Sequence, residues 1–365
     1  MISFPGLRSE TWGAKLFARE NFCSLSEDGF GFLAGEANDV GNGIFVGERI
    51  FGDVRGMDGE HVSGLGEELT TARRSRGEDE RHGDSSRVAS SVYDGGMIFA
   101  NRELAQRLER TEGYACTEFA VARKKVFPEC DSAWMRCGGA DVVFDGVDAP
   151  TTQTFGLGMF EEPTEAVLEE IERFFAERGT ATMLEVCPLA GVAAQEILCV
   201  RGYRPIEISN VLYRSVEKAQ ERGGDGIRVR VVGADETEQW RAVSARGWTH
   251  AHPELEGFMR EVGAILAARE RSPCFLAELE GVPGAAGGLC VHDGVALFAG
   301  AATVPEMRRK GLQAALLETR MRYAHEHGCD LAMMVAEAGS ESQRNAERQG
   351  FRVAYTRVKW KKEGL

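Results

Sequence analysis

The pattern of hydrophobic and polar positions changes period from segment to segment in the C-terminal part of the chain. Positions that alternate with a period of two predict half-buried strands, and apolar positions that recur every three to four residues predict amphipathic helices. A Gly-Val-Pro-Gly segment at 281–284 predicts the turn of a hairpin. The predicted elements are a strand at 227–232, helices at 236–245 and 255–269, strands at 274–280, 285–292 and 295–304, a helix from 312 that ends at Gly328, a strand at 331–335, a helix at 341–348 and a strand at 353–360.

The junction between the strand at 295–304 and the helix after it is the most informative local feature. The strand carries no charge, and it leads through Arg308, Arg309, Lys310 and Gly311 into the helix. Such a helix start presents unpaired backbone amides and the positive end of the helix dipole. Three cations on the approach indicate an anionic ligand, most simply a phosphate group. The alternative is a basic helix start on the surface that binds nothing.

This junction resembles the coenzyme A pyrophosphate loop of the GNAT-type N-acetyltransferase superfamily. That loop has Arg or Gln, two further residues, Gly, one residue, and then Gly or Ala. Arg308 and Gly311 match this pattern, and Gln313 takes the position of the last small residue. The resemblance extends to the element order of residues 226–362. It implies an α/β (α+β) fold in which a mixed, mostly antiparallel central sheet is flanked by helices.

The middle of the chain repeats features of the C-terminal part at an offset of about 148 residues. Arg-Gly-Tyr-Arg at 201–204 parallels Gln-Gly-Phe-Arg at 349–352, and a strand at 182–186 corresponds to the one at 331–335. A strong helix at 163–178, with Pro near its start and Gly just past its end, takes the place of the cofactor helix. We therefore predict two tandem GNAT-like domains, at residues 97–220 and 226–363.

The first copy differs from the second where a phosphate would bind. Its strand at 152–159 leads through Glu161 and Glu162 into the helix, where the second copy has three cations. Because two carboxylates repel pyrophosphate, we predict a degenerate copy that does not bind coenzyme A. Gly-Leu-Gly at 156–158 is then a closely packed strand end. The copy would cover a face of the second domain and wall its acceptor site; alternatively, Glu161 or Glu162 attracts a cationic acceptor.

The first 96 residues have a different composition from the rest. They hold 17 of the 44 glycines, and residues 73–87 interleave Arg with acidic residues without apolar periodicity. Such a segment cannot bury enough apolar surface to offset its chain entropy. We predict a low-order Gly/Arg-rich extension without function at 1–96, leave open whether it belongs to the native protein, and predict a helix at 102–110 after it.

Charge and cysteine usage restrict the classes of partner. A net charge of -14 argues against nucleic acid or an anionic membrane as the main partner. Nine scattered cysteines without a CxxC pair or a His cluster indicate neither zinc nor a disulfide framework, and they fit a reducing cytoplasm. No apolar run approaches the roughly 20 residues that span a bilayer, and no signal peptide is recognised. We expect a cytoplasmic monomer or homodimer without a metal.

The resemblance implies acetyl-coenzyme A as co-substrate. In the superfamily the strand before the loop and the next strand splay apart around the pantetheine arm, and Ala-Gly-Ala-Ala at 299–302 suits the close approach of a ligand to the backbone. Backbone amides at 302–304 would polarise the thioester carbonyl. Asn345 matches the family's asparagine that contacts the pantetheine arm. The expected cofactor-binding residues are Ala302, Thr303, Val304, Arg308, Arg309, Lys310, Gly311, Leu312, Gln313, Ala314 and Asn345.

The acid–base residues are harder to assign. Many family members place a Tyr four residues before the Gly-Phe pair, and here that position is Ala346. Glu337, at the end of the strand after the splay, and Tyr355 are the proposed catalytic residues, acting on the amine and the leaving thiolate. Tyr323 and Glu278 are further candidates. A core role for the tyrosines and a solvated surface role for the glutamates are the alternatives.

Two functions follow from the resemblance. The leading one is an acyl-coenzyme A dependent N-acetyltransferase, in which an amine of the acceptor attacks the thioester directly and the protein holds both reactants in line. The other is a non-catalytic sensor that binds acyl-coenzyme A. The acceptor is open at this point: a small amine, an amino acid, an aminoglycoside-like antibiotic and a protein amino group all fit.

Overall fold

A computed structural model describes residues 92–93, 97–147, 149–217, 226–250 and 252–363. The predicted extension at 1–96 therefore lies almost wholly outside the described residues. Its described part is β1 (Val92–Tyr93), which pairs antiparallel with β2 (Met97–Ile98). These two strands do not belong to the compact unit that holds Ala100–Leu365, which contains all the other elements.

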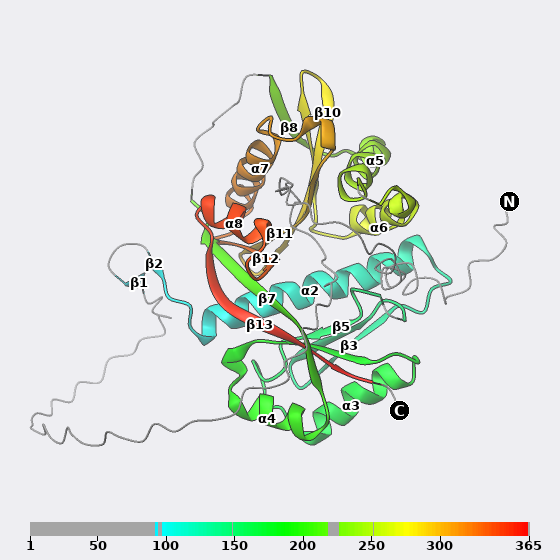
Figure 1. Ribbon diagram of the computed structural model, residues 1–365, viewed down its shortest axis with the longest axis vertical. Coiled ribbons are helices and arrows are strands. Elements are labelled where there is room, and N and C mark those ends of the chain that lie inside the picture. The colour runs from blue at the N-terminus through cyan, green and yellow to red at the C-terminus, as the bar shows by residue number, and fades with distance from the viewer. Residues whose placement is uncertain (1–91, 94–96, 148, 218–225, 251, 364–365) are drawn as a thin grey trace, which may run out of the picture. The chain divides into compact units, whose positions relative to one another are not determined.

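One mixed sheet of eleven strands runs through this unit, in the order β3-β4-β5-β6-β13-β7-β12-β11-β10-β9-β8 (Figure 1). Two neighbouring pairs are parallel, β5 with β6 and β11 with β12, and the other pairs are antiparallel. The predicted fold class is thereby confirmed. The strands are β3 (Ala133–Cys137), β4 (Ala140–Phe144), β5 (Gln153–Phe155), β6 (Thr182–Val186), β7 (Arg204–Ser215), β8 (Ile227–Val231), β9 (Cys274–Leu279), β10 (Val282–His292), β11 (Val295–Thr303), β12 (Leu331–Glu337) and β13 (Arg352–Lys362).

Helices cover both faces of the sheet, and the strand residues alternate between them as a pleated strand requires. Phe275 and Ala277 of β9 pack in the core beneath α7, whereas Leu276 between them packs against Trp240 of α5. The helices α2, α5 and α6 lie on one face, and α3, α4, α7 and α8 lie on the other. Their bounds are α2 (Arg102–Val126), α3 (Glu165–Ala176), α4 (Val192–Val200), α5 (Thr237–Trp248), α6 (Glu256–Ala268), α7 (Leu312–Glu326) and α8 (Glu341–Arg348).

The same element order occurs twice, and the two halves exchange their last strands. Residues 102–200 run through a helix, three strands, a helix, a strand and a helix, as residues 237–348 do with one more helix. However, β7 of the first half pairs with β12 of the second, and β13 pairs with β6 of the first. The strands β7 and β13 also pair with each other at the centre of the sheet. Neither half is therefore closed by its own chain.

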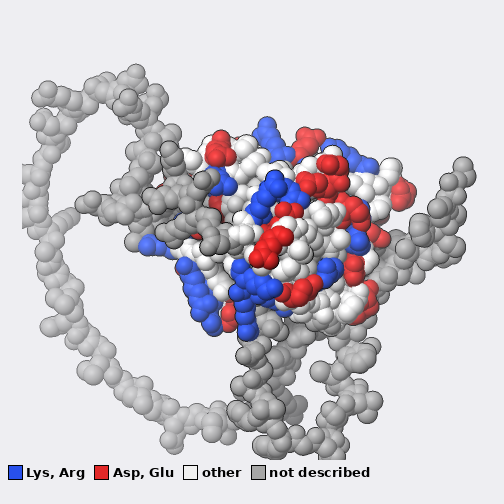
Figure 2. All heavy atoms as spheres, turned by 90° about the horizontal axis from the view of Figure 1, so that it is seen from above, with Lys and Arg blue, Asp and Glu red and all other residues white. Residues whose placement is uncertain are grey.

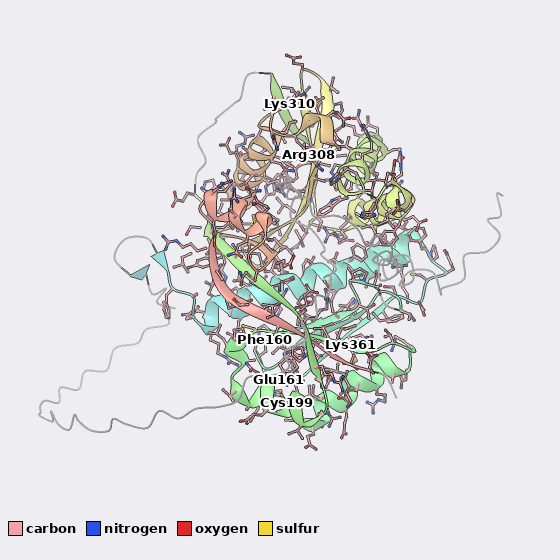
Figure 3. The ribbon with its side chains drawn as sticks, in the orientation of Figure 1. Phe160, Glu161, Cys199, Arg308, Lys310 and Lys361 are labelled. Atoms are coloured by element: carbon pink, nitrogen blue, oxygen red, sulfur yellow. The ribbon has the colours of Figure 1, made fainter. Side chains whose placement is uncertain are left out.

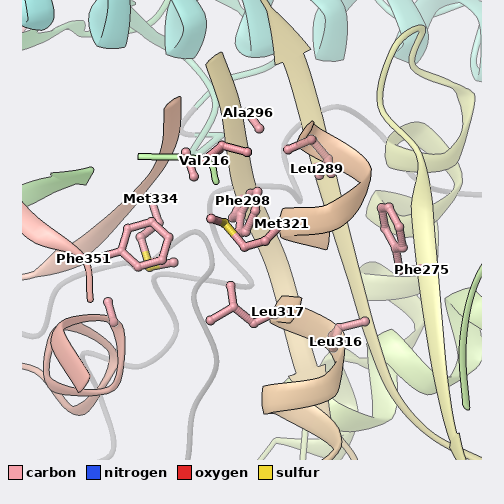
Figure 4. Close-up of a cluster of buried hydrophobic side chains, with 14 of the residues drawn as sticks. Val216, Phe275, Leu289, Ala296, Phe298, Leu316, Leu317, Met321, Met334 and Phe351 are labelled. Atoms are coloured by element: carbon pink, nitrogen blue, oxygen red, sulfur yellow. The ribbon is translucent and has the colours of Figure 1, made fainter. Parts of the chain in front are cut away.

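The main core lies between α7 and the sheet. Leu316, Leu317 and Met321 of α7 belong to one buried cluster with Phe298 of β11, and Met321 lies beside Phe298 (Figure 4). Phe298 and Phe351 meet edge to face, with ring centroids 6.2 Å apart. Such burial contributes roughly 1.5–3 kcal/mol for each large side chain, which holds the start of α7 in register with the end of β11.

Two sequence predictions differ from the structure. The helix predicted at 102–110 extends to Val126. The prediction was too short because buried polar residues, such as Glu109 and Arg123, interrupt the apolar periodicity of the helix. The hairpin predicted to turn at 281–284 instead turns at 279–282, where Leu279 pairs with Val282. Glu280 and Gly281 both have positive φ, 52° and 80°, which is the geometry of a two-residue hairpin turn.

Candidate functional site

The parallel strands β11 and β12 separate after three paired residues. Their ladder joins Val295 to Leu331 and ends where Leu297 meets Met333. Beyond this point β11 continues to Thr303 and β12 to Glu337 without pairing to each other. The predicted splay is therefore present as an opening between two strands whose facing backbone edges are unpaired with each other.

A β-bulge lies on β11 inside this opening. Ala286 of β10 pairs with Ala302 and Gly288 pairs with Ala299, so β11 carries one extra residue, and Gly300 takes a φ of +65°. A bulge re-aims the backbone locally and is common beside active sites. The amide of Val304 donates to the carbonyl of Gly284 at 2.9 Å. Because amide directions alternate along a strand, the amide of Thr303 is directed to the opposite side, that of the opening.

The helix α7 begins without any of the usual caps. Gly311 is its N-cap residue with a φ of +84°, in the left-handed region that favours glycine, and no side chain accepts a hydrogen bond from the first turn. The first turn also lacks an acidic residue. Among the residues that the structure describes, no side chain thus accepts from the backbone amides at this helix start, as an anion site requires.

The side chains at this helix start converge on Thr303. Arg308 Nε donates to the carbonyl of Thr303 at 3.3 Å, and Gln313 Nε2 donates to Thr303 Oγ1 at 2.7 Å. The Arg308 guanidinium also lies 3.1 Å from His250 Nδ1. Burial and the nearby Arg308 charge lower the pKa of His250, so the neutral ring accepts the hydrogen bond from the guanidinium. No sequence pattern marks His250, because only the fold brings it next to the loop.

The remaining predicted cofactor residues separate into buried and exposed sets. Ala302, Val304 and Leu312 are buried, so they offer backbone rather than side chains. Arg309, Lys310 and Ala314 are exposed at the loop and the first helical turn. Asn345 is half-buried on α8, where it accepts from Arg348 at 3.4 Å. The structure thus brings residues 302–314 together around one helix start.

A cavity of about 180 Å³ lies at the foot of the opening between β11 and β12. Its walls include Phe298 and Ala299 of β11 and Glu337 of β12, where the strands have just separated. The first half supplies the opposite wall, including Phe119 of α2 and Gln153 of β5. The two halves therefore share this cavity, and Glu337 lies at its edge.

A row of charged residues lies across the sheet beneath the cavity. Lys359 of β13 is opposite both Glu185 of β6 and Glu207 of β7, and its Nζ is 3.3 Å and 3.9 Å from their carboxylates. Arg357, two residues away, donates to both carboxylate oxygens of Glu112, at 2.7 Å and 3.0 Å. Burial would raise the pKa of Glu185, but the charges of Arg357 and Lys359 outweigh burial and lower it. Sequence analysis missed this row, whose one signal was a glutamate within the apolar strand at 182–186.

The structure places Tyr355 away from the cavity. Its hydroxyl donates to Glu109 of α2 at 2.7 Å, and both side chains are buried. Burial raises the pKa of Tyr355 and that of Glu109, the latter to about 7. The other two candidates are also engaged elsewhere. Glu278 pairs with Arg230 at 2.6 Å, and the Tyr323 ring packs edge to face on Phe275.

The corresponding helix in the first half, α3, has a side-chain cap at its start. Thr164 caps α3 by accepting from the amide of Val167 at 3.3 Å, and Glu161 precedes it. Figure 3 shows Phe160 and Glu161 in one half of the fold and Arg308 and Lys310 in the other. The two loops are thus separate sites with opposite charge.

The gap after β5 and β6 in the first half is bridged by a side chain. Arg102 of α2 donates to the carbonyls of Gly158 and Met159, at 2.6 Å and 3.1 Å, and to that of Leu189 at 2.5 Å. Gln106 donates to the carbonyl of Met159 at 2.6 Å. The carbonyls of Gly158, Met159 and Leu189 therefore already accept hydrogen bonds, and a ligand placed after β5 and β6 would have to compete for them.

The described residues include no cluster of three or more His, Cys, Asp or Glu side chains placed to hold a metal ion. No described helix is both long and apolar enough to cross a bilayer. Basic and acidic side chains are interspersed on the face shown in Figure 2, so that face carries no continuous basic surface.

Comparison with known proteins identifies the second half. The acetyltransferase (GNAT) family profile matches residues 235–351. A GCN5-related N-acetyltransferase from Kribbella flavida is 20% identical over 68% of this chain and 96% of its own, with a TM-score of 0.50. A tandem GNAT protein from the clavulanic acid biosynthesis pathway is 14% identical over 73% of this chain and 97% of its own, with a TM-score of 0.47. No curated protein sequence matches significantly. The family match thus covers residues 235–351, which hold α5 to α8 and the opening between β11 and β12.

Proposed function

We propose that this chain is an N-acetyltransferase that moves the acetyl group of acetyl-coenzyme A to a primary amine by direct attack. The observation that carries the proposal is the position of the opening between β11 and β12. One end of the opening meets the uncapped, basic start of α7, and the other end meets a cavity with Glu337 at its edge. A long anionic co-substrate and a small acceptor would thus meet at the point where the strands part.

The residues at the opening fit coenzyme A. The amides that follow Gly311, with Arg309 and Lys310 beside them, would hold the pyrophosphate. The small residues at 299–302 and the bulge at Gly300 leave room for an extended arm along β11. Asn345 of α8 is proposed to contact the same arm. When bound, the co-substrate supplies an activated acetyl thioester.

The chain's own residues supply position and proton transfer. Holding two reactants in line replaces a bimolecular encounter and can contribute roughly 7–11 kcal/mol to lowering the barrier. The amide of Thr303, directed to the opening, is proposed to donate to the thioester carbonyl. Glu337 is proposed to accept the proton of the attacking amine, directly or through one water. Tyr355 has its hydroxyl committed to Glu109, so we do not place the acid there.

The first half is proposed to be a degenerate GNAT-like domain at 97–220, beside a catalytic domain at 226–363. The Thr164 cap, Glu161 and Glu162 disfavour an anion at α3, and Arg102 uses the carbonyls of the gap. Its proposed role is to wall the acceptor cavity, to which it contributes Phe119 and Gln153.

Substituting Gly311 tests the cofactor site. A Cβ at φ +84° strains the turn and would stand 3.3 Å from Ile227 Cδ1, where the phosphates must approach the amides. Gly311→Val should weaken acetyl-coenzyme A binding at least tenfold, about 1.4 kcal/mol, measured by calorimetry. Gly328→Val is the matched control, because Gly328 has a φ of +77° at the other end of the same helix with open space around it. Equal affinities in the two variants would contradict the proposed site.

A thiol-release assay with acetyl-coenzyme A and a panel of amines tests the reaction itself. Amine-dependent release, with acetylated amine found by mass spectrometry, is the expected result. Tight cofactor binding without release for any amine would instead favour a sensor of acyl-coenzyme A.

A further inference from the structure

The cavity shared by the two halves is small. Its volume of about 180 Å³ is below the roughly 300–1,000 Å³ of sites that enclose drug-sized ligands. A multi-ring aminoglycoside would not be enclosed by it. If the cavity takes the acceptor, as the proposed function requires, the part of the acceptor that it encloses is small.

Most charges around the cavity already have partners. Arg357 is held by Glu112 and Glu185, and Lys359 lies between Glu185 and Glu207. The Glu337 carboxylate has neither an ion pair nor a hydrogen bond among the described residues. Burial raises the pKa of Glu207; Glu185 and, less strongly, Glu337 raise it further, although Lys359 and Arg357 oppose this. An ammonium group of a ligand would relieve the repulsion between the carboxylates of Glu207 and Glu337.

On the side of the cavity formed by α6, the charge without an ion-pair partner among the described residues is positive. Arg269, directly after α6, lines the cavity and has no carboxylate partner among the described residues. Its Nε is buried and has no hydrogen-bond acceptor among the described residues. A buried donor without a partner costs roughly 1–3 kcal/mol. A carboxylate is the ligand group that best satisfies a guanidinium, because it accepts two parallel hydrogen bonds.

We propose that the cavity binds a small zwitterion, an amine that also carries a carboxylate, as an amino acid does. Its amine lies toward Glu337 and Glu207 on the sheet, and its carboxylate lies toward Arg269. This inference rests on the proposed function for the identity of the ligand as acceptor. The binding of such a ligand, however, can be measured without turnover.

Matched amines test the proposal. The probes are L-serine against ethanolamine and L-lysine against cadaverine, because each pair differs only by the carboxylate. With acetyl-coenzyme A, the amino acid of at least one pair should have a kcat/KM about tenfold higher than its amine. Equal values in both pairs, or a preference for cadaverine, would overturn the zwitterion while leaving the N-acetyltransferase proposal standing.

Substituting Arg269 provides the residue-level test. In Arg269→Gln, kcat/KM for the preferred amino acid should fall about tenfold, chiefly through KM, while that for its matched amine should change less than about threefold. Arg269→Lys should retain part of the preference because it keeps the charge. Arg271→Gln is the control, since Arg271 is exposed on the same segment and does not line the cavity. An equal loss for both probes in Arg269→Gln would contradict the proposed contact.

Calorimetry with coenzyme A present separates the two proposals. Binding of L-serine or L-lysine that weakens about tenfold in Arg269→Gln would support the zwitterion site even if no amine is acetylated. The proposed reaction alone would then have failed. No amino-acid binding, together with acetylation of cadaverine or ethanolamine, would sink the zwitterion site alone.

Discussion

Several charged side chains are buried in the interior of this fold, where strands and helices usually place apolar side chains. Glu109, Glu112 and Glu185 surround Arg357, and all four come from elements that meet where the halves join. Arg357 is buried, with its guanidinium donating to Glu112 and approaching Glu185. Removing one partner of such a group leaves an uncompensated buried charge. This cluster therefore makes stability depend on pH in a way that can be assigned to one residue.

Replacing Glu109 should change the pH dependence of stability. Burial raises the pKa of Glu109 from 4.5 to about 7, so between these values the folded protein holds a proton that the unfolded chain has lost. Stability from this group is therefore fully present below about pH 4.5 and falls as the pH rises to about 7, by on the order of 3 kcal/mol. Glu109→Gln should lose less stability between pH 5 and pH 8 than the native chain, measured by urea unfolding.

The control for this measurement is Glu103→Gln, on an exposed position of the same helix. Glu185 acts in the opposite sense, because its lowered pKa gives stability that is lost as the pH falls. The comparison between native and Glu109→Gln chains cancels that contribution. Parallel pH profiles for these two chains would contradict the assignment.

At the scale of elements, α7 and α3 occupy the same place in the two halves but differ in their first turns. Coenzyme A should therefore bind once per chain, at the uncapped, basic start of α7. Calorimetry should give one site, whose affinity weakens as salt rises, because exposed charges are screened within about 8 Å at physiological ionic strength. Two equivalent sites would contradict the assignment. Arg102→Ala should leave the stoichiometry at one.

Local sequence was sufficient for most elements and for the strand, loop and helix around Gly311. The turn at Gly311, the cations before it and the apolar face of α7 are contiguous in the sequence. One short segment therefore contains all the residues that predict this helix start. The cavity could not be predicted in this way. Glu337, Gln153 and Arg269 come from three distant segments, and only the strand register and helix packing bring them together. Buried ion pairs also hid the length of α2, since Glu109 reads as a solvent position in a periodicity analysis.

At the scale of the molecule, the exchange of β7 and β13 joins the halves more firmly than packing alone would. A half expressed without its neighbour lacks the exchanged strand that pairs with β6 or β12, and it exposes an unpaired edge there. Residues 97–217 and 226–365 produced separately should therefore aggregate or remain unfolded. Produced together, they should copurify in a one-to-one complex that unfolds in a single transition.

Size-exclusion chromatography and thermal unfolding check this prediction. A cooperative, monomeric transition in either fragment alone would show that a half is closed without the exchanged strand. Exchange of the tags between two preformed complexes should be slow, because it requires the central pairing of β7 with β13 to open.

The exchange also fixes when the protein can fold during its synthesis. Val186 of β6 pairs with Val358 of β13. The sheet of the first half therefore cannot be completed until β13 leaves the ribosome, about 170 residues later in the chain. At roughly 5–20 residues per second, that wait is on the order of 10 s. During this interval the edge of β6 is uncovered while the second half is still being made. Folding of the first half is thus coupled to completion of the second, and a chain stopped between them yields no finished domain.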